Sequence, residues 1–176
     1  MKPLLIISAA ALLVTASLNA QTKHEEKHEA KKERRKLRAE EVSYQSKQAF
    51  AADFGTINPI STQKMNDFNE FTFVKDGQIV SAFYDIDAKL VGTTFNKNFS
   101  DLPEKAQQYI HEKYVGYTPV NVLMYDDNEV NDRNMILYNT QFEDEDSYFV
   151  ELEKGNSKIV VHVSMSGEVA YYTKIK

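Results

Sequence analysis

The sequence predicts an α+β protein built as a tandem repeat, in which each copy is one helix followed by about four antiparallel strands. Three observations support this prediction: a strand pattern over residues 71–94, an apolar helical stripe that occurs twice, and glycines at matching turns of the two halves. Each helix has one apolar stripe to bury, so we expect both helices to pack on one face of a single curved sheet.

The clearest strand signature is residues 71–94, FTFVKDGQIVSAFYDIDAKLVGTT. Phe71 and Phe73 share one face because side chains alternate along a strand. Between the apolar runs lies Asp76-Gly77, a pair that accepts the positive φ of a two-residue hairpin turn. The stretch therefore predicts a hairpin followed by a third strand.

Two helices are expected. The first spans residues 23–55, where Gly55 provides a C-cap; residues 22–38 have almost no apolar face, so we expect a solvated helix or tail there. The second follows Asp101 as N-cap and ends near Gly116. Their apolar stripes are in register: Val42, Ser46, Ala49, Phe50 and Phe54 in the first, and Leu102, Ala106, Tyr109, Ile110 and Tyr114 in the second.

Runs of β-branched and aromatic residues predict four strands in the first half and five in the second. They cover residues 57–65, 68–74, 78–85, 89–95, 119–125, 133–142, 147–153, 158–165 and 168–175. Gly55 matches Gly116 and Gly77 matches Gly155, whereas Gly167 corresponds to Ala88. The repeats are thus expected at about 42–99 and 100–176.

Residues 1–20 have the three parts of a secretory signal: Lys2, an apolar run over residues 4–14, and small residues up to Ala20, after which we expect cleavage. The chain has no cysteine, so no disulfide framework is expected. We predict a periplasmic or secreted protein with a charged helical or disordered segment at 21–41 and one domain at 42–176.

The predicted domain is acidic. Residues 42–176 hold twelve Lys or Arg and twenty Asp or Glu, a net charge of 12 − 20 = −8. Such a body repels phosphates, so we expect no nucleic-acid partner.

Several sequence stretches resemble one known group. They are F-x-F-x-x-x-G at 71–77, AFYDIDAKLVGTT at 82–94, DLP-x-x-A-x-x-x-I at 101–110 and VGY at 115–117. From about Val42 onward the chain resembles the PepSY-like, β-lactamase-inhibitor-protein-like (BLIP-like) exported bacterial domains. The resemblance implies tandem α-plus-four-strand units and a binding-type role. Ala88 replaces the glycine usual in the D-x-D-G turn of that group, which questions the geometry of the turn but not the fold.

Two motifs suggest metal chemistry. His24-Glu25-Glu26-Lys27-His28 reads H-E-x-x-H, in which a helix would present two zinc ligands and a general base. It follows the expected cleavage site in a segment without an apolar stripe, so we expect a solvated charge run. Asp85-x-Asp87 opens like a calcium loop, but Asn96 stands where a bidentate Glu is required, so we expect a turn.

The candidate partner surface combines acidic connections with tyrosines. Connections often carry function and acids steer basic partners, while tyrosine suits exposed recognition faces. The candidates are Tyr84, Tyr125, Asp126, Asp127, Tyr138, Asp144 and Asp146. Solvated loops and ordinary sheet packing would explain the same residues.

We therefore predict a binding or inhibitor-like module that docks on another periplasmic or secreted protein, without catalysis, cofactor, metal or a membrane span after signal cleavage. The alternative is a small-ligand-responsive or metal-responsive periplasmic sensor whose ligand lies between the helix layer and the sheet. A hydrolase would depend on the H-E-x-x-H motif alone.

Overall fold

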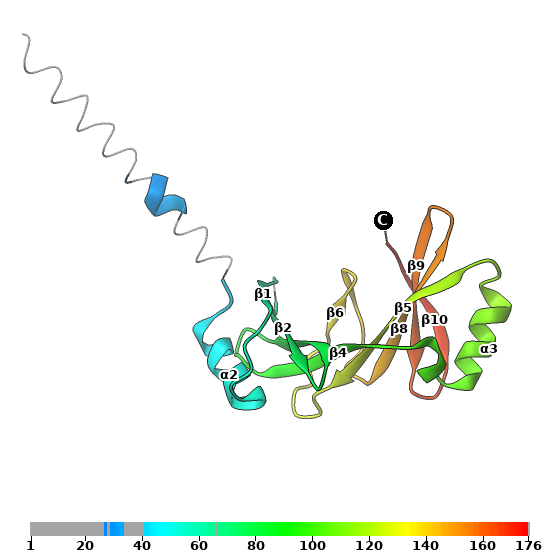
Figure 1. Cartoon of the computed structure of the whole chain (residues 1–176), viewed down its shortest axis with the longest axis horizontal. Helices are drawn as coiled ribbons and strands as arrows, with labels where there is room; N and C mark the ends of the chain where they lie inside the picture. Colours follow the sequence, from blue (N-terminus) through cyan, green and yellow to red (C-terminus); the bar gives the residue numbers. More distant parts are fainter. Residues whose placement is uncertain (1–26, 28, 34–40, 66, 176) are drawn as a thin grey trace, which may run out of the picture. The chain divides into compact units, whose positions relative to one another are not determined.

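The computed structural model describes residues 27, 29–33, 41–65 and 67–175 (Figure 1). The chain divides into two units, Met1–Glu41 and Val42–Lys176. In the first unit, residues 27 and 29–33 are helical and exposed. The predicted signal segment, His24 and His28 lie outside the described residues. Within the described ranges, no helix is long and apolar enough to cross a membrane.

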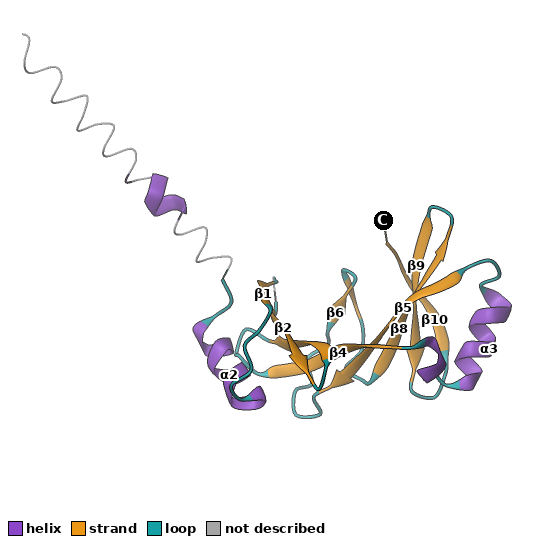
Figure 2. Cartoon of the chain, viewed as in Figure 1, coloured by secondary structure: helices purple, strands orange, loops and turns teal. Residues whose placement is uncertain are grey.

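The second unit contains one antiparallel sheet of eight strands in the order β1-β2-β3-β4-β5-β8-β9-β10. Figure 2 shows strands as the main element of this unit, together with the helices α2 (Tyr44–Phe54) and α3 (Glu104–Lys113). The strands are β1 (Ser61–Lys64), β2 (Asn69–Lys75), β3 (Gln78–Tyr84), β4 (Leu90–Lys97), β5 (Thr118–Asp127), β8 (Ser147–Lys154), β9 (Ser157–Ser164) and β10 (Val169–Ile175). Seven of these strands match the predicted ranges within two residues at each end, whereas β1 is shorter than the predicted range 57–65 and is exposed throughout.

The predicted strand at 133–142 is instead a hairpin, β6 (Ile136–Leu137) and β7 (Thr140–Gln141), outside the main sheet. Tyr138 and Asn139 form its turn with φ of 52° and 60°. Two successive positive φ angles define the tight turn that suits a hairpin, but a bulky residue there gives no sequence signal.

The other turns follow the sequence prediction more closely. Asp76 and Gly77 have φ of 52° and 79°, as the Asp-Gly pair predicts. Ala88 has φ of 60°, so the turn keeps a left-handed residue even though alanine replaces glycine.

Helix α2 (Tyr44–Phe54) begins after Ser43, whose Oγ accepts the Ser46 N–H at 3.0 Å. Gly55 ends it with φ of 74° and donates to the Ala51 carbonyl. Residues 41–43 are not helical, so the predicted helix from residue 23 is wrong in this part. A hydroxyl cap and the onset of apolar packing start a new helix at Tyr44.

Helix α3 (Glu104–Lys113) follows a 3₁₀ turn, η1 (Phe99–Asp101). Asp101 accepts the Asn98 N–H at 2.8 Å, so it closes the 3₁₀ turn and is not the α3 N-cap that we expected. Pro103 occupies the cap position of α3.

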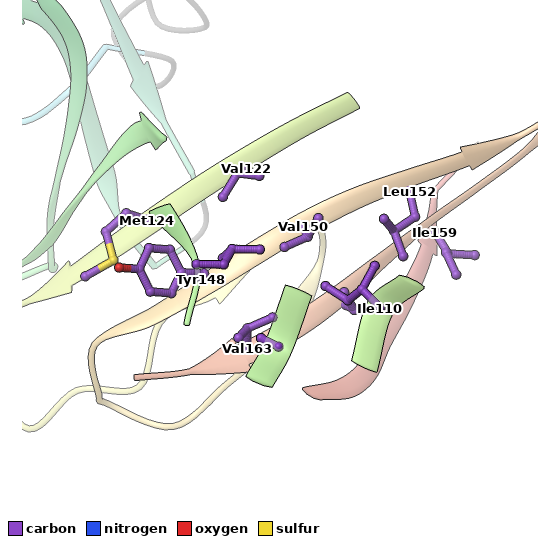
Figure 3. Packing of buried hydrophobic residues seen from close by; sticks show 11 residues of the cluster. Ile110, Val122, Met124, Tyr148, Val150, Leu152, Ile159 and Val163 are labelled. Carbon is purple, nitrogen blue, oxygen red and sulfur yellow. The ribbon is translucent and has the colours of Figure 1, made fainter. Parts of the chain in front are cut away.

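Both helices cover the same face of the sheet. Phe50 of α2 stacks on Phe71 at 4.8 Å between ring centroids, in a cluster with Phe73 and Tyr84. In a second cluster, α3 places Ile110 against the strands β5, β8 and β9 (Figure 3). The predicted stripes are therefore confirmed, except that Tyr109 is 41% exposed.

The opposite face is covered in its centre by the β6–β7 hairpin. Met135 and Phe142 pack there on Tyr125, Phe149 and other residues of the sheet. Because side chains alternate, Phe149 of β8 faces the hairpin while its neighbour Val150 faces α3. Hence the central strands are buried on both faces.

We predict that Phe50→Ala lowers the free energy of unfolding by about 3–5 kcal/mol and Ile110→Ala by about 2–5 kcal/mol, since each leaves a cavity under a helix. Tyr44→Ala is the matched control, because Tyr44 is an aromatic residue of α2 that is 70% exposed, and should change it by less than about 1 kcal/mol. Urea denaturation measures all three. Equal effects of Phe50→Ala and Tyr44→Ala would contradict this packing.

Candidate functional site at the acidic end of the sheet

The pairing of β5 with β8 brings two acidic segments together. Tyr125 lies opposite Ser147, so the end of β5 adjoins the start of β8. The Asp127 N–H donates to Asp146 Oδ1 at 2.8 Å. Residues far apart in the sequence thus form one acidic end of the sheet: Asp126, Asp127, Asp144 and Asp146.

This acidic end contains a hollow of about 350 Å³. Its lining residues are Asp127, Glu129, Asp144, Glu145, Asp146, Ser164, Met165 and Ser166. Ser164 ends β9, and Met165 and Ser166 lie in the turn that follows it. Their proximity to the acids depends on the β8–β9 pairing, so no local sequence signal indicates it. Among the residues that the structure describes, no group of three acids or histidines is arranged to hold a metal ion.

Asp144 has the most perturbed carboxyl of this end. Burial raises its pKa to about 7, and the neighbouring carboxyl of Asp127 together with the negative charges of Asp132 and Glu129 acts in the same direction. The charge of the acidic end therefore changes near neutral pH.

Asp126 points to the other face of the sheet, because neighbouring side chains of β5 alternate. Burial raises its pKa, Asp146 and Asp127 raise it further, and Lys75 opposes them. Asp126 and Lys75 line a second hollow of about 210 Å³, next to Phe54 and Phe95. The four predicted acids therefore lie on both faces at this end of the sheet and do not share one cavity.

The expectation that Tyr84 and Tyr125 are exposed is wrong, since both are fully buried. Tyr84 lies under α2 and donates to Asp53 Oδ2 at 2.8 Å. Tyr125 lies under the hairpin and donates to the Val91 carbonyl, with Asp127 Oδ1 also at 3.2 Å. Alternation assigns each ring to a face, but it does not show that the face is covered.

Tyr125 also explains a glycine in β4. A Cβ at Gly92 would lie 2.6 Å from the Tyr125 ring, a distance that real Cβ atoms do not adopt. Gly92 is therefore required for the close approach of this ring to β4.

Tyr138 is half-buried and holds the hairpin to the sheet. Its hydroxyl donates to Glu151 Oε1 at 2.9 Å, and Glu151 also accepts from Asn121. Tyr172 donates to the Leu137 carbonyl at 3.1 Å and is also within reach of the Thr140 carbonyl. These two tyrosines have structural roles in the fold, whereas Tyr171 is 60% exposed.

Asp85 organises the turn between β3 and β4. Its Oδ1 accepts the N–H groups of Asp87 and Lys89, both at 2.9 Å. Its Oδ2 accepts from Asn131 at 3.3 Å and lies 3.7 Å from Arg133 Nε. The turn predicted for this segment is confirmed, and the buried carboxylate also ties it to the loop after β5.

The fold is of the BLIP-like α+β class, as comparison with solved structures shows. No family model matches the chain, and no curated protein matches it. A DUF2874 family protein from Bacteroides uniformis superposes with a TM-score of 0.61 at 13% identity, over 76% of this chain and 90% of that one. A BLIP-like protein from Bacteroides fragilis gives 0.56 at 16% identity, over 77% and 87%.

A third structure, a Bacteroides eggerthii protein provisionally assigned to the periplasm, gives a TM-score of 0.61 at 14% identity, over 77% of this chain and 90% of that one. At these identities the likeness shows the fold alone. Kinship with PepSY-like domains stays a prediction.

We predict that the contribution of Asp144 to the free energy of unfolding falls as pH rises. Its folded-state pKa of about 7 lies above the ordinary 3.8, so its contribution is complete below about pH 4 and is lost through pH 7. Thermal unfolding of the wild type and Asp144→Asn, measured from pH 4 to 8, should show the wild type losing stability relative to the variant.

The comparison with the variant is needed because His162 acts in the opposite direction. Burial lowers the pKa of His162, so its contribution is lost as pH falls below its ordinary 6.5. His162 is present in both proteins and cancels in the difference. A difference that does not change with pH would contradict a proton on Asp144.

Proposed function

We propose that the protein is an exported binding module that docks on a basic surface of another periplasmic or secreted protein. One observation carries the proposal: two acidic segments from separate connections meet at one end of the sheet, with Asp127 joined directly to Asp146. Loops held by a rigid sheet are common positions for recognition residues.

The comparisons and the sequence support the export and the binding role. A BLIP-like protein and a protein provisionally assigned to the periplasm share the fold, and residues 1–20 have the pattern of a secretory signal. We also propose that residues 42–176 form one domain of two α-plus-four-strand repeats, since α2 and α3 each cover one part of the same sheet face.

Electrostatic attraction is the recognition mechanism that we propose. A cluster of negative charge accelerates encounter with a positive patch and orients the partner, and salt weakens both effects. Since Asp144 has a pKa of about 7, mild acid reduces the charge of this end. Binding to a basic partner should therefore weaken below neutral pH.

We propose no catalytic role for this end. A protonated carboxyl beside an ionised one is a possible acid and base pair. However, the hollow around Asp127 and Asp144 is lined mainly by other acids and serines, with Met165 as its apolar side chain. Such a lining offers little apolar surface to position a substrate.

The proposal is tested with the partner that the purified protein captures from periplasmic extract. Asp126, Asp127, Asp144 and Asp146 are changed together to Asn, which keeps the oxygen that accepts the Asp127 N–H. We expect the association rate to fall on the order of tenfold at low salt, with a smaller difference at high salt. Stopped-flow fluorescence measures it.

The matched control removes four exposed acids elsewhere: Asp67, Asp76, Glu104 and Glu112. It changes net charge equally, so an equal loss of rate in the control would show that only total charge matters. Unchanged association of the Asn variant would exclude the acidic end as the docking surface.

A further inference from the structure

We propose that the groove between the β6–β7 hairpin and the sheet binds a small primary amine that has an apolar body. The groove has a volume of about 360 Å³, within the range of small-molecule sites. Its lining residues are Met65, Glu70, Ser81, Phe83, Thr94, Leu123, Ile136, Leu137, Tyr138 and Asn139. This site is separate from the acidic end and does not depend on the function proposed above.

Apolar side chains form most of the walls of the groove. The sheet contributes Phe83 and Leu123, and the hairpin contributes Ile136 and Leu137. All four pack against the cluster that fills the hairpin face. A ligand without an apolar body would leave these walls in water, so an apolar body is expected.

Glu70 is the single charged residue of the lining. It is half-buried, and among the described residues its carboxylate forms no ion pair. It lies directly opposite Phe83 in the β2–β3 pairing. A carboxylate beside an aromatic ring, here that of Phe83, attracts an ammonium group by charge and by cation–π interaction. The charge of Glu70 therefore selects a cation.

Thr94 provides a second polar group in the groove lining. It is 5% exposed, and within the described part of the chain its hydroxyl makes no hydrogen bond, whereas Ser81 beside it pairs with Thr72 at 3.0 Å. Since Thr94 lines the groove, its hydroxyl is open to it and can pair with a polar group of the ligand. Thr94 on β4 lies two strand spacings from β2, about 10 Å, so the ligand's second polar group belongs at the end remote from the amine.

The groove is preformed because its hairpin wall is anchored. Tyr172 donates to the Leu137 carbonyl, and Tyr138 donates to Glu151 across the sheet face. Met135 and Phe142 at the base of the hairpin are buried. A fixed wall reduces the ordering cost of binding.

The test is an NMR titration of the purified protein with three probes of one shape. Tyramine has the amine and a remote hydroxyl, 2-phenylethylamine lacks the hydroxyl, and 3-(4-hydroxyphenyl)propionate replaces the amine by a carboxylate. We expect tyramine to shift amide signals of β3, β4 and the hairpin, and to bind at least about tenfold more tightly than the propionate.

Variants then separate the contributions of Glu70 and Thr94 to binding. Glu70→Gln should weaken tyramine about tenfold, since it removes the charge and keeps the shape. Thr94→Val should remove the advantage of tyramine over 2-phenylethylamine. Glu104→Gln on α3, an exposed acid on the other face, is the control and should change neither affinity.

Three results would overturn the proposal. They are equal affinity for the amine and the carboxylate probes, shifts confined to residues outside the groove, and tyramine affinity unchanged in Glu70→Gln. The amide spectrum of each variant shows whether it is folded, so a loss of binding through unfolding is recognised in the same experiment.

Discussion

The constraint on which the structure depends is that one antiparallel sheet has to be covered on both faces at its centre. β5 and β8 carry large apolar residues on alternating positions, such as Phe149 toward the hairpin and Val150 toward α3. Exposure of either set to water would destabilise the fold, because burial of each aromatic ring contributes a few kcal/mol. The helices therefore cover one face, and the short β6–β7 hairpin covers the middle of the other.

This arrangement decides where polar groups are placed. The centre is apolar on both faces, and the carboxylates lie where β5 ends and β8 begins. There the Asp127 N–H donates to the Asp146 side chain and joins the two segments. The hairpin is narrower than the face that it covers, so a groove with Glu70 and Thr94 in its lining remains beside it. The acidic end is open and suited to a protein surface, whereas the groove is small and suited to one molecule.

Much of the fold follows from the sequence, because alternation and turn chemistry are local. The Asp76-Gly77 turn, the presence of the eight strands of the main sheet and the burial of Phe50 and Ile110 were all predictable. The hairpin was not, since its turn places Tyr138 and Asn139 at positive φ without a glycine. Consequently the burial of Tyr125 was missed, and so was the groove, because both depend on what packs over a strand. The four acids could be proposed individually, but their meeting at one end depends on long-range strand pairing.

The central claim is that the acidic end is the docking surface. The most direct measurement is site-specific photocrosslinking in the periplasm of a bacterial host, with the photoreactive residue placed at exposed Glu145 beside the acidic hollow or at exposed Glu112 on α3. The account predicts a crosslinked protein partner from position 145 and none from position 112. A partner crosslinked from position 112 alone would contradict it and would move the docking surface to the helix face.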